Sequence, residues 1–133
     1  MVERLDHVGI VVDDLEGVSR AFEAILGAAP EGGAVPGAPF DVRVFRLGET
    51  DVELLRFERP LEGVDPAVFE AGGIQHLAFR VRSLDAALAA LKARGVEPLR
   101  GFPRAGVHGR IAFFREPVTG QLLELVERSH PED

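Results

Sequence analysis

The chain has 133 residues, which suits one compact domain or two small modules that share a core. It is 46% hydrophobic and 28% charged and contains no cysteine, which excludes disulfides, zinc–thiolate sites and thiol nucleophiles. The net charge of −7 argues against nucleic acid and anionic membranes as partners, and no apolar run approaches the roughly 20 residues that span a bilayer. We therefore expect a cytoplasmic protein.

The first half of the chain predicts a strand, a helix and a hairpin. Branched apolar residues favour strands, while Gly and Pro mark turns and loops. In chain order we expect a strand at 5–12, a helix between Asp13 and Gly27, a Gly- and Pro-rich loop at 28–39, and hairpin strands at 42–47 and 52–57. A connector with a short helix at 65–69 follows.

The same order then restarts. The second half predicts a strand at 74–81, a helix capped by Ser83, and strands at 111–114 and 121–126. His7 and His76 are 69 positions apart, and Glu53 and Glu124 are 71 apart because the second hairpin turn is longer. An internal repeat therefore organises the chain. Module 1 spans about 3–58, the connector 59–72 and module 2 about 73–128, all within one domain, 1–133.

Each repeat places one histidine on its first strand and one glutamate on its last. Carboxylates within apolar strands are costly unless they are paired or coordinated. If the modules pair by pseudo-twofold symmetry, His7, Glu53, His76 and Glu124 converge at the centre. Such a set suits one divalent ion (Co, Ni, Mn, Fe or Zn) with positions left open for substrate. The alternatives are two buried His–Glu pairs without metal, or a site that has decayed.

These features resemble the vicinal oxygen chelate (glyoxalase/bleomycin resistance/dioxygenase) superfamily, and within it most closely the methylmalonyl-CoA epimerases. The resemblance rests on five stretches along nearly the whole chain: Leu5–Val12, Leu47–Leu55, Asp65–His76, Pro103–Gly109 and Leu123–Leu125. It implies an α+β fold in which two βαβββ modules form a curved mixed sheet around a central cleft. It also implies metal ligands at His7, Glu53, His76 and Glu124, and a homodimer.

The chain departs from the epimerase pattern in two places that concern the site. The family has a second catalytic glutamate before its third strand segment, whereas residues 33–40 contain no Glu. The family has a doubled His before its second metal strand, which here is Gln75-His76. Because side chains alternate along a strand, we expect Gln75 to face away from the metal.

The resemblance implies a metal-dependent isomerase or epimerase that acts through an enolate or enediolate of a small carbonyl substrate, which includes acyl-CoA thioesters. Glu124 would act as both ligand and catalytic base. A glyoxalase I-type lyase and a non-catalytic small-molecule-binding or resistance protein of the same fold remain alternatives. A ring-cleaving dioxygenase fits less well, because it uses two His and one carboxylate.

Basic residues gather late in the chain, with six between Lys92 and Arg115 against the single acid Glu97. They predict either a rim that binds a carboxylate or phosphate of a ligand, or basic residues whose charge simply offsets that of the acidic first half. As substrate-binding candidates we take Arg104, His108 and Arg110, each of which has the alternative of being a solvated loop residue.

Overall fold

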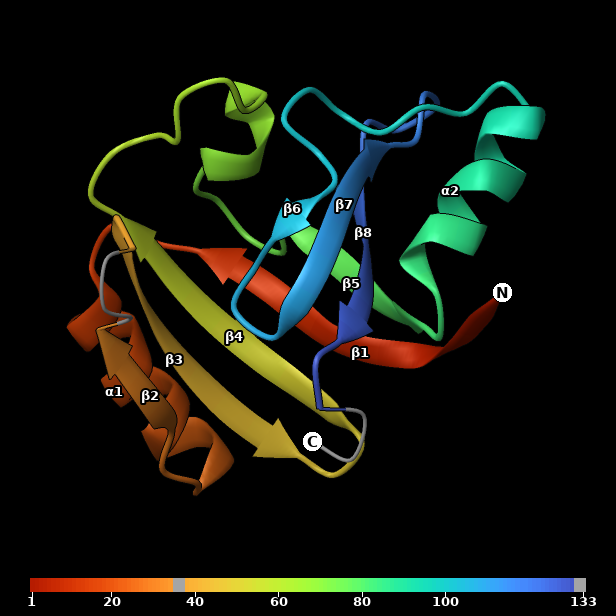
Figure 1. Cartoon of the computed structure of the whole chain (residues 1–133). Coiled ribbons are helices and arrows are strands. Elements are labelled where there is room, and N and C mark those ends of the chain that lie inside the picture. Colours follow the sequence, from red (N-terminus) through yellow and green to blue (C-terminus); the bar gives the residue numbers. More distant parts are fainter. Residues whose placement is uncertain (35–37, 131–133) are drawn as a thin grey trace.

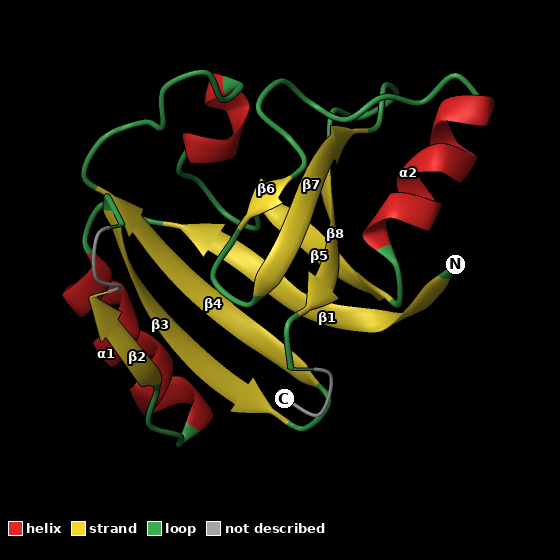
Figure 2. Cartoon of the chain, viewed as in Figure 1, coloured by secondary structure: helices red, strands yellow, loops and turns green. Residues whose placement is uncertain are grey.

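The computed structural model describes residues 1–34 and 38–130. Its elements, shown along the chain in Figure 1, are β1 (Val2–Val11), α1 (Leu15–Leu26), β2 (Glu31–Ala34), β3 (Phe40–Leu47), β4 (Thr50–Phe57), the 3-10 helix η1 (Pro66–Phe69), β5 (His76–Val81), α2 (Leu84–Ala93), β6 (Arg104–Ala105), β7 (Gly109–Arg115) and β8 (Leu122–Arg128). The strands form one curled sheet with the two α-helices outside it (Figure 2).

The strand order makes the internal repeat visible. The eight strands lie in the order β2-β3-β4-β1-β5-β8-β7-β6, so each half repeats the arrangement of the other. Strands β1 and β5 pair antiparallel at the centre, while β1 pairs parallel with β4 and β5 pairs parallel with β8. The predicted pair of βαβββ modules around a curved mixed sheet is confirmed.

The residue pattern did not place two edge strands, although the βαβββ order implied by the resemblance includes one in each module. The expected loop at 28–39 contains β2, whose residues Glu31 to Ala34 pair with β3. This segment is Glu-Gly-Gly-Ala and has no branched residue, so pairing with its neighbour, and not local propensity, makes it a strand. The two-residue β6 likewise exists only through its pairing with β7. Residues 35–37 of the acid-free segment lie outside the described residues.

Helix α1 covers the convex face of the first module. Asp14 caps its first turn by accepting a hydrogen bond from the backbone of Gly17, and Gly27 ends it in the left-handed conformation at φ 68°. The buried Leu15 packs against Phe45 and Leu54, both fully buried. The predicted helix boundaries are confirmed.

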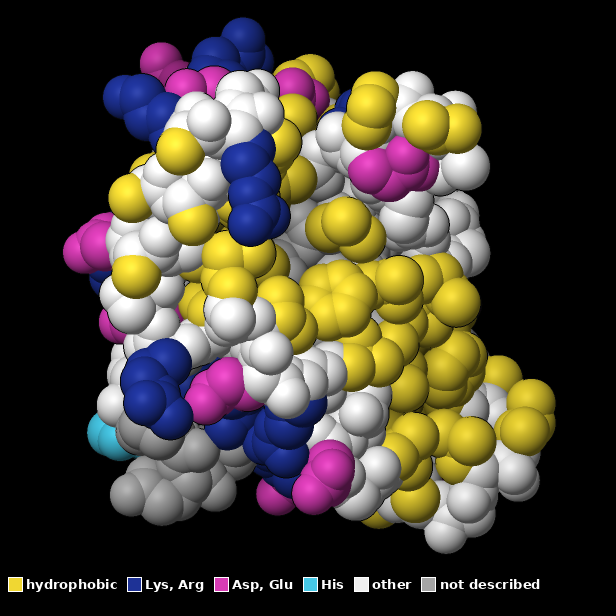
Figure 3. All heavy atoms as spheres, turned by 90° about the vertical axis from the view of Figure 1, so that its right-hand side faces the viewer, with side chains coloured by type: hydrophobic (Ala, Val, Ile, Leu, Met, Phe, Trp, Pro, Cys, Tyr) yellow, Lys and Arg dark blue, Asp and Glu magenta, His cyan; other side chains and the backbone are white. Residues whose placement is uncertain are grey.

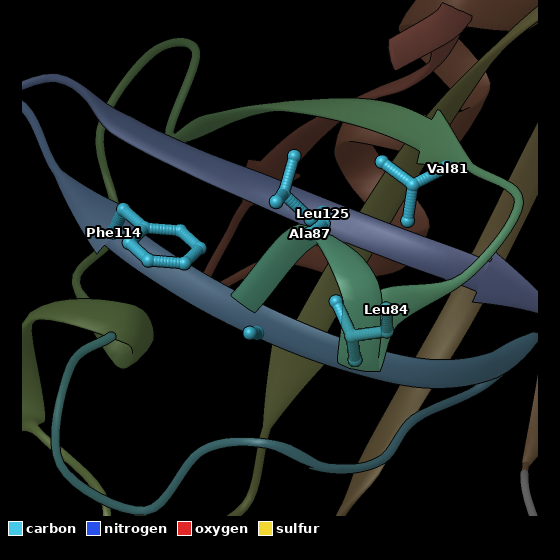
Figure 4. Packing of buried hydrophobic residues seen from close by; sticks show 6 residues of the cluster. Val81, Leu84, Ala87, Phe114 and Leu125 are labelled. Carbon is cyan, nitrogen blue, oxygen red and sulfur yellow. The ribbon is translucent and has the colours of Figure 1, made fainter. Parts of the chain in front are cut away.

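Helix α2 covers the convex face of the second module in the same way. Ser83 caps it by accepting a hydrogen bond from the backbone of Ala86. Its apolar face packs on β7 and β8, as seen close by in Figure 4. The residues of this cluster are Val81, Leu84, Ala87, Ala112, Phe114 and Leu125. Burying a side chain such as Leu84 contributes about 1.5–3 kcal/mol to stability.

Between the two helices, a central stripe of the convex face has only partial cover. Val8 pairs with Val52 on β4 and with Leu77 on β5, and Leu77 pairs with Leu123 on β8, so the four side chains share one face. All four are half-buried. A side view of the molecule shows hydrophobic side chains gathered in a continuous patch (Figure 3). Within residues 1–34 and 38–130, no helix is long and apolar enough to cross a membrane.

Candidate metal centre

The concave face carries the four predicted ligands in two neighbouring rows across the sheet. In the first row, His7 on β1 pairs with Ala78 on β5, which pairs with Glu124 on β8. Residues that pair across strands share a face, so His7 and Glu124 point into the same space. The small, fully buried Ala78 lies between them and leaves that space open.

The second row repeats this arrangement, with the glutamate now in the first module and the histidine in the second. Glu53 on β4 pairs with Gly9 on β1, which pairs with His76 on β5. The imidazole of His76 lies so close to Gly9 that a Cβ added there would be 2.0 Å from its Cε1 atom. The missing side chain of Gly9 therefore leaves the space that this imidazole occupies.

Three of the four predicted ligands form a compact triangle. The Nε2 atoms of His7 and His76 are 3.4 Å apart, and the carboxylate of Glu124 lies 3.5 Å from the first and 3.6 Å from the second. All three side chains are buried. Donor atoms bound tetrahedrally to one zinc-sized ion at about 2.0–2.2 Å are about 3.3–3.6 Å apart. The triangle therefore fits one divalent ion without rearrangement.

The ring of His7 is oriented by the residue immediately before it. Its Nδ1 donates a hydrogen bond of 2.7 Å to the buried Asp6, which directs Nε2 toward the triangle. Arg80 and Arg128 donate to the other sides of the same carboxylate at 2.7–3.0 Å. A register shift between Leu5 and His7 in β1 accounts for Asp6 and His7 both facing inward.

Asp6 was not predicted as a site residue, because strict alternation places it on the opposite face from His7. The only sequence signal was its position directly before a candidate ligand.

Gln75 does the same for His76, and the expectation that it faces away from the site was wrong. It is buried, its side-chain oxygen accepts from Nδ1 of His76, and its amide donates to the carbonyl of Ala67 at 3.2 Å. Strand β5 begins only at His76, so the alternation rule does not apply to Gln75. Nδ1 thus carries a proton in both imidazoles, so Nε2 is the nitrogen of each ring that binds an ion when it is deprotonated.

Burial and mutual interaction shift the pKa values of the triangle far apart. Burial alone would lower the pKa of His7, but the carboxylates of Glu124, Asp6 and Glu53 outweigh it and raise the pKa to about 9. Burial raises the pKa of Glu124 to about 7. Burial, with the neighbouring His7, lowers the pKa of His76 to about 3. A cluster of this kind is typical of functional sites.

Glu53, the fourth predicted ligand, lines the same cavity, but its carboxylate lies outside the triangle, 3.4 Å from Nδ1 of His7. Within the described part of the chain, the cluster with metal-binding geometry consists of His7, His76 and Glu124 and does not include it. The Glu53 carboxylate accepts a 3.0 Å hydrogen bond from Nε2 of His108. Burial tends to raise the pKa of Glu53, but His108 and His7 hold it below its usual value.

The triangle opens into a cavity of about 100 Å³. His108 and Arg104, two of the three predicted substrate-binding residues, lie in its wall. The structure does not bring Arg110 there, because Arg110 pairs with the exposed Asp85 of α2 at 3.0 Å. Most of the remaining wall is apolar: Phe40, Leu55, Phe57, Leu61, Val64, Val68, Phe69, Phe102, Ile111, Phe113 and Val126.

Known proteins share this sequence and fold. The chain is 38% identical to an ethylmalonyl-CoA/methylmalonyl-CoA epimerase of Cereibacter sphaeroides, over 94% of this chain and 98% of that protein. It is 35% identical to the human mitochondrial methylmalonyl-CoA epimerase, over 92% of this chain and 72% of the relative. A solved structure of a Streptomyces coelicolor methylmalonyl-CoA epimerase variant with 2-nitronate-propionyl-CoA matches with a TM-score of 0.79, at 27% identity, over 98% of this chain and 100% of that one.

The model of one family matches residues 6–114, which include β1 with His7 and β5 with His76. The resemblance found in the sequence is thereby confirmed. The chain belongs to the glyoxalase/bleomycin resistance protein/dioxygenase superfamily.

Proposed function

We propose that this protein is a divalent-metal-dependent epimerase of an acyl-CoA thioester. The observation that carries the proposal is the triangle of His7, His76 and Glu124 at a small, mostly apolar cavity. Two relatives that match more than nine-tenths of this chain are named as epimerases of methylmalonyl-CoA. The fit of the triangle to an ion and the names of these relatives support the same activity.

The metal would be held by Nε2 of His7, Nε2 of His76 and the Glu124 carboxylate, with Glu53 as the predicted fourth ligand. The donor set of imidazoles and carboxylates suits Co, Ni, Mn, Fe or Zn. A bound divalent ion supplies a Lewis acid for the oxygens of a carbonyl substrate.

The protein's own residues supply the proton chemistry and the binding surface. Epimerisation requires that the proton at the carbon beside the thioester carbonyl be removed and returned to the opposite face. Glu124 is the proposed base on one face of the α-carbon, because its buried carboxylate lines the cavity in which that carbon would lie. Arg104 and His108, on β6 and the loop after it, are the proposed substrate contacts.

We further propose that residues 1–133 work as one domain, that two copies form a homodimer, and that the enzyme acts in the cytoplasm. The half-buried stripe of Val8, Val52, Leu77 and Leu123 supports the dimer, because a continuous apolar sheet face favours pairing with a like surface.

Metal content and proton exchange test the activity. Wild type, His76→Ala and the exposed control His130→Ala are purified without chelator and analysed for transition metals. Protein is quantified by amino-acid analysis, because the chain has no Tyr or Trp. Each is then incubated with methylmalonyl-CoA in D2O, and loss of the α-proton signal is followed by NMR.

We expect one metal ion per chain and α-proton exchange in wild type and His130→Ala, and loss of both in His76→Ala. A wild type that stays metal-free after reconstitution contradicts the proposal. Exchange on a hemithioacetal but not on the acyl-CoA would assign the protein to the glyoxalase I-type lyases instead.

A further inference from the structure

We propose that Arg104 determines the charge specificity of this enzyme by binding a free carboxylate on the acyl part of the substrate. The inference rests on the proposed function and adds to it a residue that selects among thioesters.

The pairing of β6 with β7 directs Arg104 into the cavity. Arg104 pairs with Ile111, and Ile111 pairs with Val126 on β8. Both partners line the cavity, so the side chain of Arg104 shares the concave face with them and lines it too. The half-buried position of Arg104 thus results from strand register, and Arg104 is not a solvated loop residue.

Arg104 has no partner of its own. Within residues 1–34 and 38–130, its side chain makes no hydrogen bond and no ion pair. The acids that line the cavity are Glu53 and Glu124, which already interact with His108 and with the imidazole of His7. A guanidinium held beside an apolar wall without an acid is poised to bind an anion from outside.

The charges around the cavity favour an anionic substrate. The carboxylates of Glu53 and Glu124 together carry two negative charges, which a bound divalent ion would balance. Arg104 then leaves one positive charge in excess. A substrate with one carboxylate neutralises it, whereas an uncharged acyl group leaves a half-buried cation without compensation.

Two anionic groups of an acyl-CoA can pair with an arginine, namely the acyl carboxylate and the phosphates of the CoA. Arg104 lines the same cavity as His7, His76 and Glu124, where the reacting carbon would lie. A carboxylate on the α-carbon lies next to that carbon, while the phosphates lie at the far end of the pantetheine arm. The geometry therefore favours the carboxylate.

The test uses truncated substrates without phosphate. Metal-loaded wild type, Arg104→Gln, Arg104→Lys and the control Arg110→Gln are compared on the N-acetylcysteamine thioester of methylmalonate and on the same compound with its carboxylate methyl-esterified. Exchange of the α-proton in D2O gives kcat/KM, and calorimetry gives the affinity of each compound. Arg110→Gln removes a nearby arginine that lies outside the cavity.

We expect Arg104→Gln to lower kcat/KM and affinity about 10- to 100-fold for the carboxylate compound, as for loss of a charged hydrogen bond, and to leave the ester nearly unchanged. Arg104→Lys should recover part of this loss, and Arg110→Gln should change neither compound. Equal losses for acid and ester overturn the proposal. So does an Arg104→Gln variant that handles the phosphate-free acid as well as wild type does, which would leave only the phosphates of CoA as partners of Arg104.

These outcomes separate the two proposals. If the wild type exchanges no α-proton on methylmalonyl-CoA, the epimerase function is wrong, and the difference in affinity between acid and ester still decides the role of Arg104.

Discussion

The imidazole of His76 lies directly over the Cα of Gly9, in the space that a side chain at position 9 would fill. A Cβ there would be 2.0 Å from Cε1 and 2.2 Å from Nε2 of His76. Because Gly9 lies between His76 and Glu53 in the second row of the site, its missing side chain is what allows that row to hold an imidazole.

Gly9→Ala should therefore displace His76 from the triangle. Loss of a residue that only orients a metal ligand lowers metal affinity about 10- to 100-fold. We expect Gly9→Ala, which displaces the ligand itself, to lower it at least as much, as measured by competition with a chelator. Overpacking should also lower the free energy of unfolding by about 1–3 kcal/mol. Unchanged metal affinity in a folded variant would show that His76 is not a ligand.

Gln75→Ala should weaken the metal site without removing a ligand. Its side chain holds Nδ1 of His76, so its loss frees the ring to rotate and should lower metal affinity about 10- to 100-fold. Gln121→Ala is the matched control, because the side-chain amide of Gln121 donates to the backbone carbonyls of Gln75 and Leu122 and holds no imidazole. Equal metal affinity in the two variants would argue against an orienting role for Gln75.

Asp6→Asn should be the most destabilising conservative change at this site. Asp6 is buried and bonded to His7, Arg80 and Arg128, so neutralising it leaves buried positive charge uncompensated. We expect a loss of about 3–5 kcal/mol in the free energy of unfolding, measured by denaturant titration.

The control for Asp6→Asn is Asp85→Asn, which breaks the exposed pair with Arg110 and should change stability little. Similar losses in the two variants would mean that the buried network contributes no more than a surface pair.

Metal affinity should rise with pH in two stages. Binding must displace the proton of His7, whose pKa is about 9, and below pH 7 also that of Glu124, whose pKa is about 7. Each displaced proton changes the apparent affinity about tenfold per pH unit, so we expect the slope to approach about 100-fold per unit below about pH 6 and to be about tenfold per unit near pH 8. His76 contributes nothing here, because its pKa of about 3 leaves it neutral.

Chelator competition with Mn²⁺ across this range measures both slopes. An affinity that does not change between pH 7 and 9 would show that His7 carries no proton in the metal-free protein.

The dimer can be tested at the stripe between the helices. Leu77→Lys places a charge in the middle of the half-buried row, whereas Ile25→Lys changes an 82% exposed residue of α1 that is remote from it. We expect sedimentation to show a dimer for wild type and Ile25→Lys and a monomer for Leu77→Lys. A monomeric wild type would contradict the proposed dimer.

The repeat of strand, helix and hairpin, with histidine and glutamate at matching positions, was enough to predict that two modules pair and that His7, His76 and Glu124 meet at their centre, while the βαβββ order came from the resemblance. This worked because alternation along a strand fixes which face a side chain takes, and a twofold repeat then brings equivalent faces together. The edge strand β2 could not be predicted, since Glu-Gly-Gly-Ala becomes a strand only beside β3.

Tertiary structure alone decided which side chains complete the site. The register shift in β1 turns Asp6 inward beside His7, and the late start of β5 frees Gln75 to hold His76. Strand pairing directs Arg104 into the cavity, while Arg110 is held outside by Asp85. The approach of His108 to Glu53 joins residues 55 positions apart. Each of these depends on register and on contacts between distant segments, which local sequence patterns do not encode.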